Sequence, residues 1–180
     1  MMKQMSPRDR SAVVAALVKE YRDRRMFCGE TLLQKSVFFL QEMLDVPLGF
    51  EFQLYIYGPF SFELQRHVSA MRGDDMLKVT PNGVVSNIEP AEQMAWLERH
   101  SAPAIASALP AIRFVADHLG AKGVKQLEKW ATALYFTCSL PAASVDERAA
   151  KICAVKPHIS VDEARKAVEE VDEWRRQVAA

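Results

Sequence analysis

The sequence lacks the features that mark several common classes of functional site. Its few cysteines lie far apart with no CxxC pair, and its histidines show no ligand spacing among themselves or with the cysteines. These residues are Cys28, Cys138, Cys153, His67, His100, His118 and His158. Phosphate-binding loops of the GxxxxGKS/T or GxGxxG type are also absent. We therefore expect no metal, no cofactor and no catalytic residue, and we interpret the cysteines as small buried side chains in a reducing compartment.

An excess of charge and a long apolar run are lacking too. The 180 residues carry 23 Lys and Arg against 23 Asp and Glu, so the chain has no overall attraction for nucleic acid, although a local basic face is compatible with this balance. Met1–Gln4 precede no apolar run of the signal-peptide kind, and no run approaches the ~20 residues that span a bilayer. We expect a cytoplasmic protein with no membrane partner.

The most informative stretch is residues 31–64. An apolar helix is predicted from about Thr31 to Leu44, with Gln34 and Lys35 on its solvent side. Strict alternation over residues 50–57 predicts one half-buried strand, whose Tyr55 and Tyr57, with Phe60 beyond them, either pack under a neighbouring helix or contact a partner. We favour packing. Gly58 and Pro59 end the strand, and Ser61 can cap a helix over residues 61–72.

Flanking segments complete a recognisable order. Ser6 can cap a first helix, and two β-prone runs around Asn82-Gly83 predict a hairpin over residues 76–88. Helix, helix, strand, helix and hairpin is the order of a winged helix, in which the helix at 61–72 would be the recognition helix and the hairpin the wing.

The second half of the chain is predicted to be all-helical. We expect helices from Glu89-Pro90 to about His100, over residues 101–119 with a kink or break at Pro110, and over residues 124–136, 144–155 and 160–176. The expected fold is mainly α with a small β component. A winged-helix-like half (residues 1–89) would pack as one compact unit with a C-terminal helical bundle (residues 90–180).

A winged helix suggests candidate contacts to DNA or to a partner. They are the polar outer residues of the predicted recognition helix and wing: Gln65, Arg66, Ser69, Arg72, Lys78 and Asn82. Arginine and glutamine can read guanine and adenine edges. Three acidic residues lie nearby in the chain and would repel phosphate: Glu63, Asp74 and Asp75. The positive charge available to attract DNA is therefore small.

Several short motifs together resemble a bacterial and archaeal family called YwgA-like, from about residue 10 to residue 172. They are Leu33-Gln34-Lys35, the strand running into Tyr57-Gly58-Pro59-Phe60-Ser61, the helix Leu127-Glu128-Lys129-Trp130-Ala131-Thr132, and the loop Lys156-Pro157-His158-Ile159-Ser160. Ala133 departs from the family pattern, which has isoleucine there. The family is distantly similar to the Panacea domain of SocA-type antitoxins. The resemblance implies a winged-helix-like domain with a helical extension and no enzyme.

Three functions remain open from the sequence. The first is a non-enzymatic regulatory or adaptor protein that acts through protein contacts, in an antitoxin-like or defence-associated setting, with a toxin, a protease adaptor or another protein as partner. The second is a DNA-binding transcriptional regulator that uses the 61–72 helix and the wing. The third is an enzyme of unknown chemistry, for which a Cys138–His158 pair would be the best local candidate.

Overall fold

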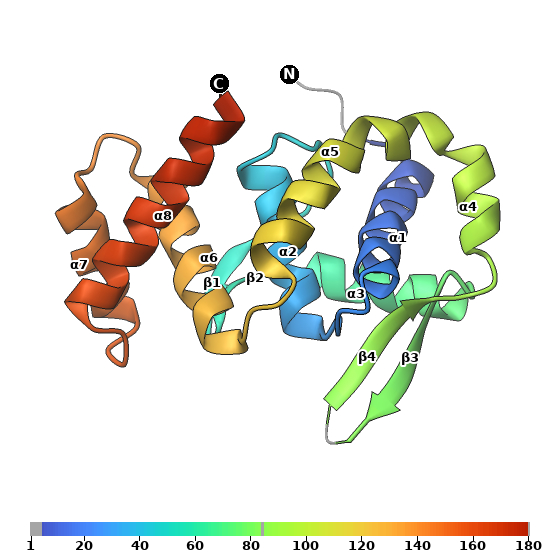
Figure 1. Cartoon of the computed structure of the whole chain (residues 1–180), viewed down its shortest axis with the longest axis horizontal. Coiled ribbons are helices and arrows are strands. Elements are labelled where there is room, and N and C mark those ends of the chain that lie inside the picture. The colour runs from blue at the N-terminus through green and yellow to red at the C-terminus, as the bar shows by residue number, and fades with distance from the viewer. Residues whose placement is uncertain (1–4, 84, 180) are drawn as a thin grey trace.

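The computed structural model describes residues 5–83 and 85–179, and the fold is mainly helical with two small antiparallel hairpins (Figure 1). Its elements are α1 (Pro7–Asp23), α2 (Glu30–Glu42), β1 (Gln53–Tyr55), β2 (Gly58–Phe60), α3 (Phe62–Gly73), β3 (Leu77–Asn82), β4 (Val85–Pro90), α4 (Met94–His100), α5 (Ala102–Leu119), α6 (Val124–Ser139), α7 (Val145–Val155) and α8 (Val161–Ala179). The predicted fold class is confirmed. Met1–Gln4, considered above for a signal peptide, and Val84 of the predicted wing lie outside the described residues.

Helices α1 and α2 form the centre of the molecule. Helix α1 begins where the sequence predicts, since the Ser6 hydroxyl accepts a 3.1 Å bond from the Asp9 amide. Helix α5 packs against α1, and both α5 and α6 pack against α2. Residues from both halves of the chain thus form one cluster of buried side chains. The domain boundary at residue 89 stays a prediction.

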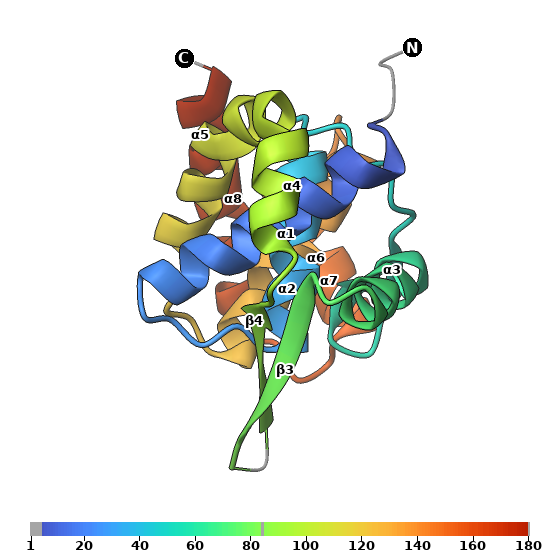
Figure 2. The same ribbon diagram turned by 90° about the vertical axis from the view of Figure 1, so that its right-hand side faces the viewer.

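Helix α3 and the β3–β4 hairpin, which we call the wing, follow in the order of a winged helix. Ser61 caps α3 through a 3.1 Å bond from the Leu64 amide. The strands of the wing pair from Leu77 opposite Pro90 to Asn82 opposite Val85, and the wing projects from the body with α3 beside its base (Figure 2). The predicted helix start at Glu89-Pro90 is wrong, because these residues extend β4.

The prediction of one strand over residues 50–57 is also wrong, because the strand is shorter. Only β1 is extended and paired, and its partner is β2, so the two strands form a small ribbon that we call the central hairpin. The backbone of Phe50 pairs instead with a helix side chain: its N–H donates to Gln41 Oε1 at 2.8 Å, and its carbonyl accepts from Gln41 Nε2 at 2.9 Å. Ile56, which the alternation over residues 50–57 places on the same face as Phe50, Phe52 and Leu54, lies in the turn and is 63% exposed.

Helix α5 continues through Pro110 as one helix, so the predicted break does not occur, and the predicted kink stays a prediction. A proline removes the bond to the carbonyl one turn earlier, here that of Ala106. Both Pro110 and Ala106 are exposed, so water can solvate that carbonyl and the helix continues.

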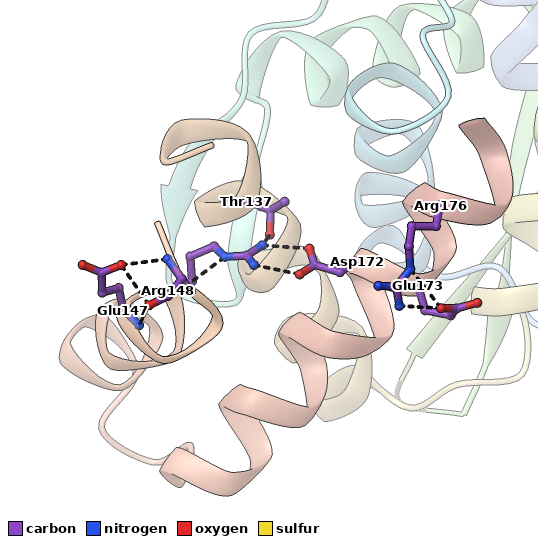
Figure 3. A network of polar contacts seen from close by, with 7 residues as sticks. Thr137, Glu147, Arg148, Asp172, Glu173 and Arg176 are labelled. Atoms are coloured by element: carbon purple, nitrogen blue, oxygen red, sulfur yellow. Dashed lines mark hydrogen bonds and ion pairs between the residues drawn. The ribbon is translucent and has the colours of Figure 1, made fainter. Parts of the chain in front are cut away.

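An ion pair ties α7 to α8 at the other end of the molecule (Figure 3). The Arg148 guanidinium donates to both carboxylate oxygens of Asp172, at 2.8 and 2.7 Å, and to the Thr137 hydroxyl of α6 at 2.8 Å. Ser144 forms a full capping box with Glu147 at the start of α7, which was not predicted from the sequence. Ser160 and Glu163 exchange the same bonds at the start of α8. Val161, whose spacing from Ala164 and Val168 places it on the apolar face of this helix, is exposed.

Candidate functional site

Two polar residues of α2 hold the central hairpin from inside the molecule. Gln34 and Lys35 are each 2% exposed, so their predicted position on the solvent side of α2 is wrong. The Gln34 amide accepts from the backbone N–H of Ser61 and donates to its carbonyl, both at 3.0 Å. Lys35 Nζ donates to the Pro59 carbonyl at 2.8 Å. Because these partners come from a later segment of the chain, the periodicity of α2 could not reveal them.

Lys35 is a buried cation in a small group of charges. Burial lowers its pKa to about 8; the nearby Glu128 carboxylate opposes this shift and the Lys156 ammonium adds to it. Glu128, on α6, is 4% exposed. The cluster therefore places two lysines and one glutamate behind the hairpin.

The loop between α7 and α8 holds the hairpin from the other side. Lys156 Nζ donates to the carbonyls of Tyr55, at 2.9 Å, and Ile56, and lies 3.1 Å from Glu128 Oε1. His158 Nε2 lies 3.3 Å from the other carboxylate oxygen of Glu128, and its side chain is 61% exposed. Pro157, between them, is exposed. We call Gln34, Lys35, Glu128 and Lys156 the hairpin clamp.

The turn of the hairpin requires glycine at position 58. Gly58 has a φ of +84°, a region that side chains disfavour, and a Cβ there would lie 3.1 Å from Thr132 Oγ1. Thr132 is fully buried, and its hydroxyl has no hydrogen-bond partner among the described residues. The positive φ and the close packing between the turn and α6 thus explain the glycine at position 58.

The tip of the hairpin is apolar and faces solvent. Tyr55, Ile56 and Tyr57 are 47%, 63% and 58% exposed, so the packing that we favoured for the two tyrosines is wrong. The Tyr55 ring makes edge contacts with Phe60 and Phe62, at centroid distances of 5.8 and 5.5 Å. A hollow of about 540 Å³ lies beside the tip and is lined in part by Glu128, Val155, Lys156 and His158. This surface is a candidate contact site.

The predicted DNA contacts gather elsewhere, on α3 and the wing. All six are exposed: Gln65, Arg66, Ser69, Arg72, Lys78 and Asn82. Gln65 donates to Glu30 at 3.0 Å, and the Ser69 hydroxyl donates to the Gln65 carbonyl. Glu63 forms a 2.7 Å ion pair with Arg10, which reduces its repulsion of phosphate, whereas Asp74 and Asp75 remain exposed.

The arrangement does not bring the candidate nucleophile pair together. Cys138 Sγ contacts the Glu42 carbonyl at 3.8 Å, while His158 pairs with Glu128. Burial raises the pKa of Cys28 to about 12 and also raises the pKa of Cys138, so neither thiol is activated. Within the described residues, no group of three or more His, Cys, Asp or Glu side chains could hold a metal ion.

Sequence reasoning from the residues alone missed Glu128 and Thr132. Both lie on the side of α6 that faces the hairpin, one turn apart. The available signal was a glutamate directly beside the buried stripe of Leu127 and Ala131, together with the resemblance that named this helix.

In comparisons with known proteins, no family model matches the chain, and no curated protein matches it. None of the helices within residues 5–83 and 85–179 combines the length and apolar character that crossing a bilayer requires. The YwgA-like resemblance therefore stays a prediction. Three of its motifs, residues 33–35, 57–61 and 156–158, nevertheless meet in one place together with Glu128.

Proposed function

We propose that the protein is a non-enzymatic regulatory or adaptor protein that binds a protein partner through the tip of the central hairpin. The observation that carries this proposal is the exposure of Tyr55, Ile56 and Tyr57 on a turn whose backbone is fixed by buried side chains. Tyrosine is enriched at interface positions that dominate binding energy, because its ring buries a large area with few rotatable bonds. The antitoxin-like or defence-associated setting rests on the family resemblance alone.

The clamp supports binding because it lowers the cost of ordering the contact surface. Three backbone carbonyls of the hairpin, those of Tyr55, Ile56 and Pro59, accept bonds from buried lysines. A loop that is already ordered loses less conformational entropy when it binds. The tip can therefore present its side chains to a partner in a fixed arrangement.

The test is a comparative capture experiment with quantitative mass spectrometry. The binding variant replaces Tyr55, Ile56 and Tyr57 by serine, and the matched control replaces three exposed valines on other elements, Val124, Val161 and Val178, by serine. We expect one or a few proteins from the source organism's lysate to be captured by the wild type and the control and lost with the binding variant. If both variants capture the same proteins as the wild type, the hairpin tip is not the contact site.

A second candidate, a DNA-binding regulator, is favoured by the open outer face of α3. Arg66 and Arg72 form no ion pair within the described residues. Figure 2 shows α3 at the edge of the molecule, and Figure 1 shows α7 and α8 at the opposite end from α3 and the wing. Fluorescence anisotropy with duplex DNA across a salt series tests this candidate. If the two arginines contact phosphate, each Arg→Gln substitution should lower the salt slope by about one. An unchanged slope in both variants would exclude this role for α3.

A further inference from the structure

A cavity of about 380 Å³ separates α3 from the wing and from the start of α2. Its apolar side chains come from all three elements: Leu33, Leu64, Val68, Val79 and Ile88. Such a volume is at the small end of the range for pockets that hold small organic ligands, roughly 300–1,000 Å³. The cavity is distinct from the central hairpin and from its clamp, apart from Gln34, which borders both.

Among the residues that the structure describes, Arg72 is the cation at the polar rim of the cavity. Glu30, at the rim, accepts a hydrogen bond from the Gln65 amide at 3.0 Å. Arg72, also at the rim, makes no hydrogen bond or ion pair with the described residues. A guanidinium offers a planar pair of donors that matches a carboxylate. The rim thus favours an anion at its Arg72 end and disfavours one at its Glu30 end.

The spacing of these groups sets the length of the ligand. Gln65 and Arg72 are seven residues apart on α3, which is about 10 Å along the helix axis. An apolar body of that length would lie over Val68 and contact Leu33 and Val79, while its charged end met Arg72. We propose that this cavity binds a small organic acid with an unbranched or compact apolar body, anchored by Arg72.

Such a ligand would touch both α3 and the wing. Ser86 of β4 borders the cavity and can donate a hydrogen bond to the second carboxylate oxygen, whereas the Ser69 hydroxyl of α3 already donates to the Gln65 carbonyl. Binding would therefore fix the position of the wing relative to α3. This inference is independent of the partner proposed for the hairpin tip.

A titration followed by amide chemical shifts in NMR tests the proposal, with sodium octanoate as the probe and octan-1-ol as its uncharged counterpart. We expect octanoate to shift amides over residues 65–72 and 79–88 and to leave residues 55–57 unaffected. Arg72→Gln should weaken octanoate binding about tenfold, since charge-assisted bonds are the strong ones. Arg66→Gln is the matched control, because Arg66 is on the same helix and does not border the cavity.

A second variant keeps the test decisive. Ser69→Phe adds a ring at the exposed rim and should abolish the octanoate shifts without disturbing the core. The proposal is overturned if octanol and octanoate bind equally well, if Arg72→Gln binds octanoate like the wild type, or if the shifts lie at the hairpin tip. Absence of any shift at millimolar octanoate overturns it as well.

Discussion

Replacement of Lys35 by methionine tests whether the hairpin clamp holds a buried cation. Methionine keeps the length and apolar stem of the side chain and removes the ammonium group. The lysine has a pKa of about 8 in the folded protein, against 10.5 for the free side chain, mainly because burial disfavours the charged form. Between these two values the unfolded chain binds more protons than the folded protein, so the free energy of unfolding rises with pH.

The size of the effect follows from the two pKa values. At pH 7 Lys35 is protonated in both the folded and the unfolded protein, so it adds almost nothing to the pH dependence of the free energy of unfolding. At pH 9.5 the folded protein has released most of it and the unfolded chain has not, which corresponds to a gain of about 2 kcal/mol in the free energy of unfolding. The buried thiol of Cys28 acts in the opposite direction above pH 9, since its raised pKa keeps the proton in the folded protein. That contribution is common to the wild type and the variant and cancels in their difference.

Urea unfolding with a reductant present, at four pH values from 7.0 to 9.5, measures this difference. The free energy of unfolding of the wild type minus that of Lys35→Met should rise by about 2 kcal/mol across the series. Lys78→Met, which removes an exposed lysine from the wing, controls for the loss of one surface charge. If the difference for Lys35→Met is constant with pH, or follows that for Lys78→Met, the ammonium group is not buried as described and the argument is refuted.

Two further substitutions test the α7–α8 ion pair and the hairpin turn, each by urea unfolding at pH 7. Arg148→Met should lower the free energy of unfolding by about 2 kcal/mol, because it leaves the half-buried Asp172 without its partner. Arg176→Met removes an exposed ion pair with Glu173 and should lower the free energy of unfolding by less than about 1 kcal/mol. Equal costs would contradict this reading of the network. Gly58→Ala should lower the free energy of unfolding more than Gly83→Ala does. Both glycines have a positive φ, at which a side chain costs about 1–2 kcal/mol, but only at Gly58 would the new methyl group contact a neighbouring side chain. A larger cost at Gly83 would show that the turn does not pack on Thr132 as described.

Features set by neighbouring residues could be predicted from the sequence. The predicted caps at Ser6 and Ser61 depend on bonds within three residues, and both occur. Ser144 and Ser160 cap their helices through bonds of the same range. The wing also follows from its Asn-Gly signal, although β4 extends two residues further than predicted because Glu89 and Pro90 pair with Lys78 and Leu77. These local rules need no knowledge of the rest of the fold.

Features set by distant partners could not be predicted. The helix periodicity places three polar residues on the solvent-exposed face of α2, but all three are buried: Gln34, Lys35 and Ser36. Ser36 pairs with the Tyr21 hydroxyl at 2.6 Å, and the other two bond to backbone atoms more than twenty residues away. A polar side chain is stable in the interior when it has such partners, and the helix periodicity carries no information about them.

The chemistry of the clamp explains how the fold and the contact surface can be separate properties of this chain. Lys35 and Lys156 bond to carbonyl oxygens, which every residue type provides, so the side chains at positions 55 and 56 are not needed to hold the hairpin. Gly58 is different, because its backbone conformation and its contact with Thr132 exclude a side chain. Substitutions of Ile56 and Tyr57 should therefore change what the surface binds and leave the free energy of unfolding nearly unchanged, whereas substitution of Tyr55 also removes its edge contacts with Phe60 and Phe62. This is why loss of binding in the serine variant would identify a contact site, whereas the same loss after substitution of Lys156 would not distinguish contact from folding.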